Sequence, residues 1–167
     1  MPADDFVVTP WNVEGDIDYD KLIKRFGTQK ITPELLSKIE KFTNESHFML
    51  RRGIFFSHRD LNRLLDDYEK GKKFFLYTGR GPSGHTHIGH LVPWVFAKWL
   101  QDKFGTKMYF QLTDDEKFWA KQDMTLEKTS QFALENALDF IALGFKPENT
   151  KIIIDTKNIK TLYPIAA

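Results

Sequence analysis

Two histidines, His87 and His90, stand three residues apart around Gly89, where a glycine-rich stretch gives way to an apolar segment. Residues three apart on a helix share one face, so both imidazole rings can reach a single ligand. Ring nitrogens donate hydrogen bonds, and a helix N-terminus adds free backbone N–H groups and a positive dipole end. This combination suits phosphate oxygens. We therefore expect His87, Gly89 and His90 to bind nucleotide phosphates, with the two histidines acting in catalysis.

Two alternative roles for the histidines stay open at this point. They could be solvated side chains at a helix start with no ligand. They could also bind a metal ion together with His85, but no carboxylate lies within the cluster and the flanking glycines suit phosphate better. No metal-ligating residues are therefore predicted.

The histidines need a strand before them and a helix after them, and the surrounding residues predict both. Apolar runs that alternate with helical patterns indicate parallel strands joined by right-handed helical crossovers. The fold class is therefore α/β, the first half of a Rossmann-like doubly wound parallel sheet. The strands are expected at residues 74–77, 108–112 and 151–154, and the helices at 90–104, 114–120 and 125–143.

Residues 1–71 form a mainly helical N-terminal extension that begins with a small hairpin around Thr9 and Pro10, and residues 72–167 form the nucleotide-binding part. In the extension, Thr32 and Pro33 predict a helix start, and Ser57 with Asp60 matches a capping box. Residues 161–167 show no cap or other terminal element. Three parallel strands are few for a covered sheet, so we expect this half-domain either to be truncated or to pack against a partner copy.

Composition excludes several classes of protein. The 167 residues are 41% hydrophobic and 28% charged with a net charge of +1, which is typical of a soluble globular domain and too little charge to wrap nucleic acid. The absence of cysteine excludes disulfides and cysteine-ligated zinc. The sequence lacks an apolar run long enough to span a membrane and a basic-then-apolar leader pattern. We expect a cytoplasmic location without membrane contact.

Several tracts occur together in an order that resembles one protein family. They are residues 77–83 (YTGRGPS), 87–90 (HIGH), 111–117 (QLTDDEK), and two upstream tracts at 18–27 and 50–60. The set resembles the tryptophanyl-tRNA synthetases of the eukaryotic and archaeal type, which are class I aminoacyl-tRNA synthetases. The resemblance covers nearly the whole chain. It implies the HUP-type catalytic domain of that class.

The resemblance also implies roles for individual residues. Tyr77 would lie beside the indole of bound tryptophan, while Gln111 and Glu116 would hold its amino group or help to shape its pocket. Gly79 and Thr113 would complete the tryptophan-binding set. The implied ATP-binding residues are Arg80, Gly81, His87, Gly89, His90 and Lys117.

The activity implied is that of a tryptophan–tRNA ligase, which uses ATP with Mg²⁺ to make tryptophanyl-adenylate and transfers the tryptophan to tRNA(Trp). The family forms homodimers, and the helix at 125–143 could contribute to the interface. The KMSKS-type lysine loop and the anticodon-binding domain of the family would lie beyond residue 167, so we expect the chain alone to be inactive. Two alternatives stay open, a non-catalytic interaction fragment and another HxGH nucleotidylyltransferase. Calorimetry tests the first, because an interaction fragment should bind neither tryptophan nor ATP. Selective binding of tryptophan over tyrosine and phenylalanine would argue against the second.

Overall fold

The computed structural model describes residues 6–8, 13–15 and 18–167, which form two compact units, Met1–Asp66 and Asp67–Ala167. The boundary between the two units along the chain lies inside helix α4 (Leu61–Glu69). A domain boundary between residues 71 and 72 remains a prediction. The tip of the predicted hairpin lies outside the described residues, but its two strands pair antiparallel, with Phe6 opposite Gly15.

The first unit is mainly helical, with two small antiparallel strand pairs, β1 with β2 and β3 with β4. Its first helix ends at Gly27, which adopts the left-handed conformation at φ 60°. As predicted, Thr32 caps α2 by accepting from the Leu35 N–H, with Pro33 at the first helical position. Its elements before α4 are β1 (Phe6–Val8), β2 (Val13–Gly15), α1 (Tyr19–Phe26), β3 (Gln29–Lys30), α2 (Pro33–Thr43), α3 (Phe48–Arg51) and β4 (Ser57–His58).

Histidines cap the next two helices. Nδ1 of His47 accepts from the Met49 N–H at 3.3 Å, and Nδ1 of His58 accepts from the Leu61 N–H at 3.2 Å. The capping box predicted from Ser57 and Asp60 is therefore wrong: Ser57 pairs with β3, and Asp60 has a φ of 59°. Burial lowers the pKa of both His47 and His58, which favours the neutral ring that can accept a hydrogen bond.

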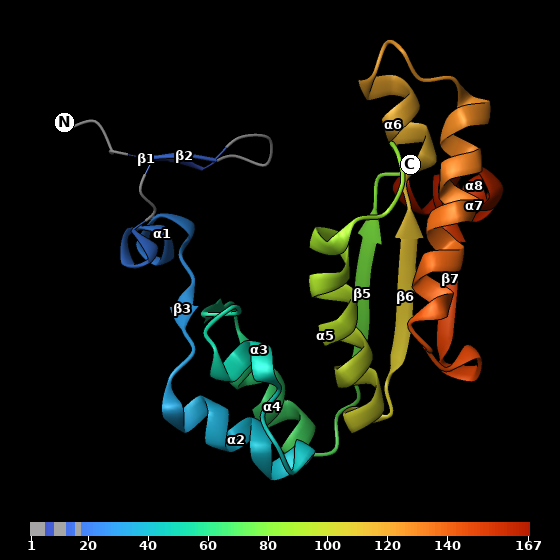
Figure 1. Cartoon of the computed structure of the whole chain (residues 1–167). Helices are drawn as coiled ribbons and strands as arrows, with labels where there is room; N and C mark the ends of the chain where they lie inside the picture. The colour runs from blue at the N-terminus through green and yellow to red at the C-terminus, as the bar shows by residue number, and fades with distance from the viewer. Residues whose placement is uncertain (1–5, 9–12, 16–17) are drawn as a thin grey trace. The chain divides into compact units, whose positions relative to one another are not determined.

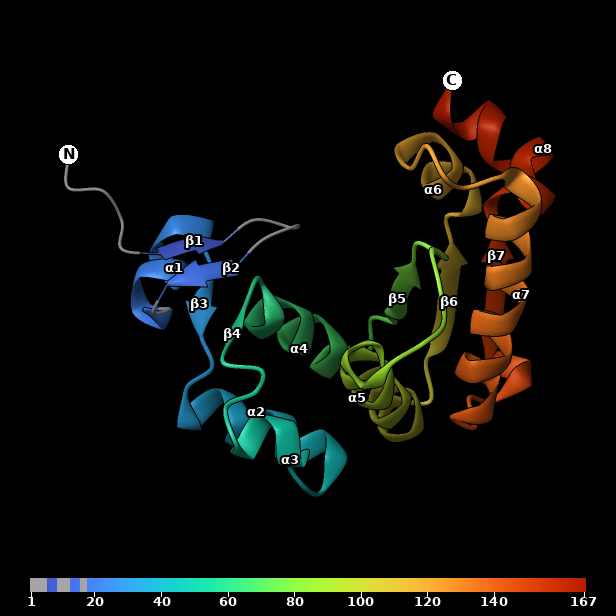
Figure 2. The same ribbon diagram turned by 45° about the horizontal axis from the view of Figure 1, so that its top comes forward.

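The second unit contains a parallel sheet of order β5-β6-β7, and the arrowheads of β5 and β6 in Figure 1 both point towards the end where α6 lies. The alternation of parallel strands and helices that the sequence predicts is confirmed. In both views, Figure 1 and Figure 2, α7 runs alongside β7. The elements are β5 (Phe75–Arg80), α5 (Ile88–Phe104), β6 (Lys107–Leu112), α6 (Asp114–Ala120), α7 (Leu126–Ala142), the short 3₁₀ helix η1 (Pro147–Asn149), β7 (Thr150–Ile154) and α8 (Asp155–Ala166).

An aromatic core fixes α5 and α7 against one face of this sheet. Phe110 of β6 stacks on Phe140 of α7 with ring centroids 3.8 Å apart, and Trp94 of α5 meets Phe110 edge-on at 5.1 Å. All three rings are almost completely buried. Side chains alternate between the two faces of a strand, so Phe75 and Tyr77 of β5 lie on the other face, where they are 63% and 62% exposed. That accessible face carries part of the candidate site.

Helix α8 contradicts the expectation that residues 161–167 belong to no element, because it continues to Ala166. Its start is held by a tertiary contact. The fully buried carboxylate of Asp114 accepts from the backbone N–H of Thr156 at 3.1 Å and from its hydroxyl at 2.6 Å. Figure 2 shows α8 beyond the end of β7. Among the described residues, no helix has both the length and the apolarity that a bilayer crossing requires.

The histidine caps make the stability depend on pH. An unfolded histidine titrates near pH 6.5. The pKa of His47 and of His58 is lower in the folded chain than in the unfolded chain. The stabilisation that the two caps contribute is therefore fully present above about pH 6.5 and is lost as the pH falls through the folded-state pKa. We expect the thermal midpoint, followed by circular dichroism, to fall between about pH 7.5 and about pH 5.5.

The His58→Asn variant keeps a capping acceptor that does not titrate, so its midpoint should fall less. The His85→Asn variant is the matched control, because His85 caps no helix in the described part of the chain, and it should show the full decrease. Equal pH dependence of His58→Asn and the unsubstituted chain would contradict the capping role.

Candidate active site

Polar side chains gather where β5, β6 and β7 end. Parallel pairing places Tyr77 opposite Tyr109 and Gly79 opposite Gln111, so Tyr77 and Gln111 share the accessible face. The Tyr77 hydroxyl donates to Oε1 of Gln111. Nε2 of Gln111 in turn donates to both carboxylate oxygens of Asp155, at 2.8 and 3.0 Å. The carboxyl ends of parallel strands are the usual ligand-binding edge of such sheets.

Glycine is required at position 79 because β5 and β6 lie close together there. A Cβ atom added at this position would lie 2.5 Å from the backbone oxygen of Gln111, a distance that side chains do not tolerate. The missing side chain also leaves open the face beside Tyr77 and Gln111. Gly79 therefore shapes the site without contributing a functional group.

The start of α6 supplies a charged group next to this edge. The Thr113 N–H donates to the Arg80 carbonyl at 3.1 Å, which joins the ends of β6 and β5. One carboxylate oxygen of Glu116 accepts from Nζ of Lys117 at 2.8 Å, and the other accepts from the Thr113 hydroxyl at 2.7 Å. These two hydrogen bonds lower the pKa of Glu116, which is therefore ionised near neutral pH. The Lys117 stem lies over Gly81, where an added Cβ would come within 1.9 Å of it.

His87 and His90 form a reciprocal cap at the start of α5. The helix begins at Ile88, two residues before the predicted start, and His87 is its N-cap. Nδ1 of His87 accepts from the Gly89 N–H and Nδ1 of His90 accepts from the His87 N–H, both at 3.2 Å. The ring centroids are 3.7 Å apart. The cap gives both rings a structural role at the helix start, and their binding of a ligand stays a prediction.

The capping bonds fix the tautomer of both rings. An imidazole whose Nδ1 accepts a hydrogen bond carries its proton on Nε2 when neutral. Burial lowers the pKa of His90, and the positive charge of Arg80 lowers it further, so this ring is neutral near pH 7. The pair therefore offers two Nε2–H donors next to the free N–H groups of a helix start, which is suitable chemistry for an anion.

Arg80 points into the loop between β5 and α5. Its Nη2 donates to the carbonyl of Gly84 at 3.0 Å and to that of His85 at 2.9 Å. The Gly84 carbonyl also accepts from Nδ2 of the buried Asn136 on α7, at 3.2 Å. Burial lowers the pKa of Arg80, although the guanidinium stays charged. The arginine holds the loop in shape, and its predicted contact with ATP stays a prediction.

His85 lies apart from the other two histidines. Its Nδ1 is 3.2 Å from a carboxylate oxygen of Glu135 on α7, and its ring meets Phe132 edge-on. It lines a separate cavity of about 520 Å³. Within the described part of the chain, no three histidine, aspartate or glutamate side chains are placed to hold one metal ion.

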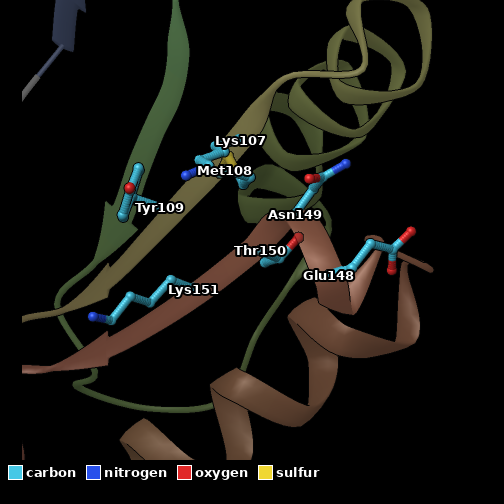
Figure 3. A pocket seen from close by; sticks show the side chains of 7 residues that line it. All are labelled: Lys107, Met108, Tyr109, Glu148, Asn149, Thr150 and Lys151. Atoms are coloured by element: carbon cyan, nitrogen blue, oxygen red, sulfur yellow. The ribbon is translucent and has the colours of Figure 1, made fainter.

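A second cavity lies at the opposite end of the sheet and does not belong to this site. It measures about 180 Å³ and is shown in Figure 3, where Lys107 and Thr150, the first residues of β6 and β7, line it. Gln111 and Asp155 lie at the other ends of those strands. The lining residues are Lys107, Met108, Tyr109, Glu148, Asn149, Thr150 and Lys151.

Asp155 and Asp114 are absent from the site residues predicted from the sequence. Asp155 directly follows the run Ile152–Ile154, and a polar residue at the carboxyl end of a parallel strand is a usable signal. Asp114 lies inside the QLTDDEK tract, where an acidic helix start is expected to be solvated. Its complete burial and its bonds to Thr156 and Ser130 have no local signal.

A family model described as tRNA synthetases class I (W and Y) matches residues 69–165, more than half of the chain. The chain belongs to the class I tRNA synthetases. The family resemblance and the fold class predicted from the sequence are thereby confirmed.

Similar proteins agree with this class I assignment. The chain is 59% identical, over 98% of its length, to the tryptophan–tRNA ligase of Sulfurisphaera tokodaii, of which it spans 43%. The crystal structure of Plasmodium falciparum tryptophanyl-tRNA synthetase matches 89% of the chain with a TM-score of 0.85 and 49% identity, over 43% of that protein. The Encephalitozoon cuniculi tryptophanyl-tRNA synthetase, crystallised bound to tryptophan, matches 85% of the chain at a TM-score of 0.80 and 44% identity, over 40% of that protein. The chain therefore spans less than half the length of these relatives.

Two glycine substitutions test the site geometry. Gly79→Ala should lower the free energy of unfolding by about 1–3 kcal/mol, because its Cβ meets the backbone of a neighbouring strand, which cannot move aside. Gly81→Ala is the matched control, since its Cβ meets only the end of the flexible Lys117 side chain. Urea unfolding of both variants measures the difference. Equal losses would show that the contact between Gly79 and Gln111 does not constrain the strands.

Proposed function

We propose that this chain forms the tryptophan-binding and HIGH-motif part of a tryptophan–tRNA ligase. One observation carries the proposal: two complementary sets of groups lie at the same edge of the sheet. Hydrogen-bond acceptors that suit an ammonium lie at the strand ends, and donors that suit phosphates lie at the start of α5. The names of the curated relatives support it, as does the Encephalitozoon cuniculi relative, which is bound to tryptophan.

In this proposal the amino group of tryptophan is held by acceptors. Gln111 and Glu116 present oxygens at the end of β6 and in α6, and Glu116 is ionised, while Tyr77 lies beside the indole. Thr113 orients the Glu116 carboxylate, and Gly79 leaves room for the substrate. An ammonium gains most from charged and strongly polar acceptors, so this set favours it.

ATP is held in this proposal by donors. His87 and His90 direct Nε2–H groups to the phosphates, with the N-terminus of α5 behind them. At Gly89 an added Cβ would lie 3.1 Å from the His87 ring, so glycine keeps that ring in place. Lys117, Gly81 and Arg80 complete the implied set. Mg²⁺ would accompany ATP on its phosphate oxygens, as part of the substrate.

In this reaction the protein contributes mainly by positioning the reacting groups. A carboxylate oxygen of tryptophan attacks the α-phosphorus of ATP, an O–P bond forms, and pyrophosphate leaves. The ribose hydroxyl at the 3′ end of tRNA(Trp) then attacks the adenylate carbonyl, loses its proton and releases AMP. The two imidazoles stabilise negative charge on the phosphate oxygens by donating hydrogen bonds to them. A cytoplasmic location is part of the same proposal.

We also propose that the protein forms a homodimer, in which α7 contributes an apolar contact. Leu134, Leu138 and Ile141 recur at helical spacing on this helix and are 49%, 66% and 54% exposed. Leu138→Glu should shift the mass measured by light scattering towards the monomer, and Glu127→Gln on the same helix should not. A monomeric unsubstituted chain would contradict this part of the proposal.

The histidine pair is tested by activity. In a chimera in which this chain replaces the matching 43% of the Sulfurisphaera tokodaii relative, tryptophan-dependent ATP–pyrophosphate exchange should be measurable. His90→Ala should slow it about a hundredfold, because one donor to the phosphates is lost. His90→Glu keeps a capping acceptor but removes the donor, so it should be at least as slow while the helix start stays intact.

His85→Ala is the control, because His85 lies outside the proposed site, and its exchange rate should match that of the parent chimera. An unchanged rate in His90→Ala would contradict the role of the pair. Exchange that does not depend on tryptophan would favour another HxGH nucleotidylyltransferase, and no exchange at all would favour a non-catalytic interaction fragment.

A further inference from the structure

The loop between β5 and α5 is tied to α7 at Gly84. The carbonyl of Gly84 accepts from Nη2 of Arg80 at 3.0 Å and from Nδ2 of Asn136 at 3.2 Å. Asn136 lies on α7, 52 positions further along the chain. His87 follows three residues after Gly84, and three residues span at most about 11 Å. The position of this carbonyl therefore limits where the histidine pair can lie.

Asn136 is a polar residue among apolar neighbours on the buried face of α7. Ala133, Ala137 and Phe140 on the same helix belong to the core, and Asn136 is fully buried like them. Its Nδ2 bonds Gly84, and its Oδ1 has no hydrogen-bond partner among the described residues. A buried amide that makes one hydrogen bond contributes little net stability, because it gives up its hydrogen bonds to water. What Asn136 positions therefore explains its presence better than the stability that it adds.

The same side of α7 acts on Arg80. Asp139 lies three residues after Asn136, so both side chains share one side of the helix. Burial lowers the pKa of Arg80, and the carboxylate of Asp139 opposes this shift. Arg80 also donates to the His85 carbonyl at 2.9 Å. The His85 side chain adds little to this hold, because 83% of it is exposed and its ion pair with Glu135 is therefore weak.

We propose that Asn136 is a positioning residue, which fixes the loop through the Gly84 carbonyl and so sets the place from which His87 and His90 donate to the phosphates of ATP. The inference rests on the proposed function of the histidine pair. Asn136 is fully buried, so it acts through the loop and not on the substrate. The placement of such donors matters, because a displacement of about 1 Å can slow a reaction on the order of a hundredfold.

The inference is tested in the chimera with the Sulfurisphaera tokodaii relative, by ATP–pyrophosphate exchange. Asn136→Ala removes the bond to Gly84, and alanine favours the helix, so α7 is kept. We expect kcat to fall about tenfold, because the donors are displaced but not lost. The KM for tryptophan should stay within about twofold, because the substitution removes no contact at the strand ends. A KM for tryptophan that rises as much as kcat falls would overturn the inference.

Gln101→Ala is the matched control. Gln101 is an equally buried amide near the other end of α5, where it accepts from the Lys146 N–H at 3.0 Å and donates to the Thr150 hydroxyl at 2.9 Å. Its loss should lower the thermal midpoint at least as much as Asn136→Ala does and leave kcat unchanged. An equal fall of kcat in both variants would overturn the inference, because a general loss of packing would then explain it.

A second variant covers the case in which Asn136→Ala does not fold. The side chain of Asn136→Ser is shorter than the asparagine amide, and its hydroxyl can donate to a carbonyl of its own helix instead of to Gly84. It should show the same fall in kcat. An unchanged kcat in either variant, once it is folded, would overturn the inference.

A spectroscopic measurement separates this inference from the proposed function. In ¹⁵N-correlation spectra of the 167-residue chain, the backbone amide of Gly89 reports on the cap, because it donates to the His87 ring. Its signal should shift in Asn136→Ala, although no hydrogen bond joins the two residues in the described structure, and it should stay in place in Gln101→Ala. If the chimera shows no exchange, the proposed function is contradicted and this signal still decides. A shift supports the positioning role of Asn136, and an unchanged signal overturns it.

Discussion

The parallel register of β5, β6 and β7 is the constraint on which the candidate site depends. It places Gly79 beside Gln111 and Leu112 beside Ile154, so the strands end at one edge of the sheet. Side chains alternate between faces, and a slip of one residue would move Tyr77 or Gln111 into the aromatic core. The stacked rings of Phe110 and Phe140 oppose such a slip, because they occupy the covered face at fixed positions. The packing of α5 and α7 thus fixes groups on the face that neither helix touches.

The second recurring interaction is an imidazole whose Nδ1 accepts a backbone N–H. Four of the five histidines use Nδ1 in this way, His47 and His58 in the first unit and His87 and His90 in the second. In the first unit the interaction only caps a helix. In the second it also directs the Nε2–H groups outwards, so one bond stabilises the helix start and prepares a donor for a ligand. Because these donors are already oriented, less free energy is needed to reorganise the site when charge develops during the reaction.

Much of the fold could be predicted from the sequence because its signals are local. The apolar runs predict the three strands of the sheet, and Thr32 with Pro33 predicts a helix start. The glycine-rich turn before His87 indicates where the candidate site lies. Strand β5 ends three residues later than predicted and α5 begins two residues earlier, because pairing and capping extend these elements beyond their apolar runs.

What could not be predicted depends on contacts that no local sequence pattern indicates, some of them between residues far apart in the chain. Helix α8 has Pro164 in its interior and weak periodicity, and it is fixed at its start by the buried Asp114. The capping role of His58 replaces a capping box that the pattern alone favours. The orientation of Arg80 into its own loop, and the link from Gln111 to Asp155, appear only once residues 4 to 44 positions apart are brought together.

The carbonyl of Gly84 has a consequence for how this protein tolerates change. It accepts from Arg80 on β5 and from Asn136 on α7, so one backbone oxygen joins a strand, a loop and a helix. Asn136 is fully buried, and its amide has no water to turn to if the loop moves. The effects of substitutions at Arg80 and Asn136 on stability are therefore not independent. The loss of either side chain changes how much the other contributes to stability. Across descendants of this sequence, the two positions should drift together or not at all.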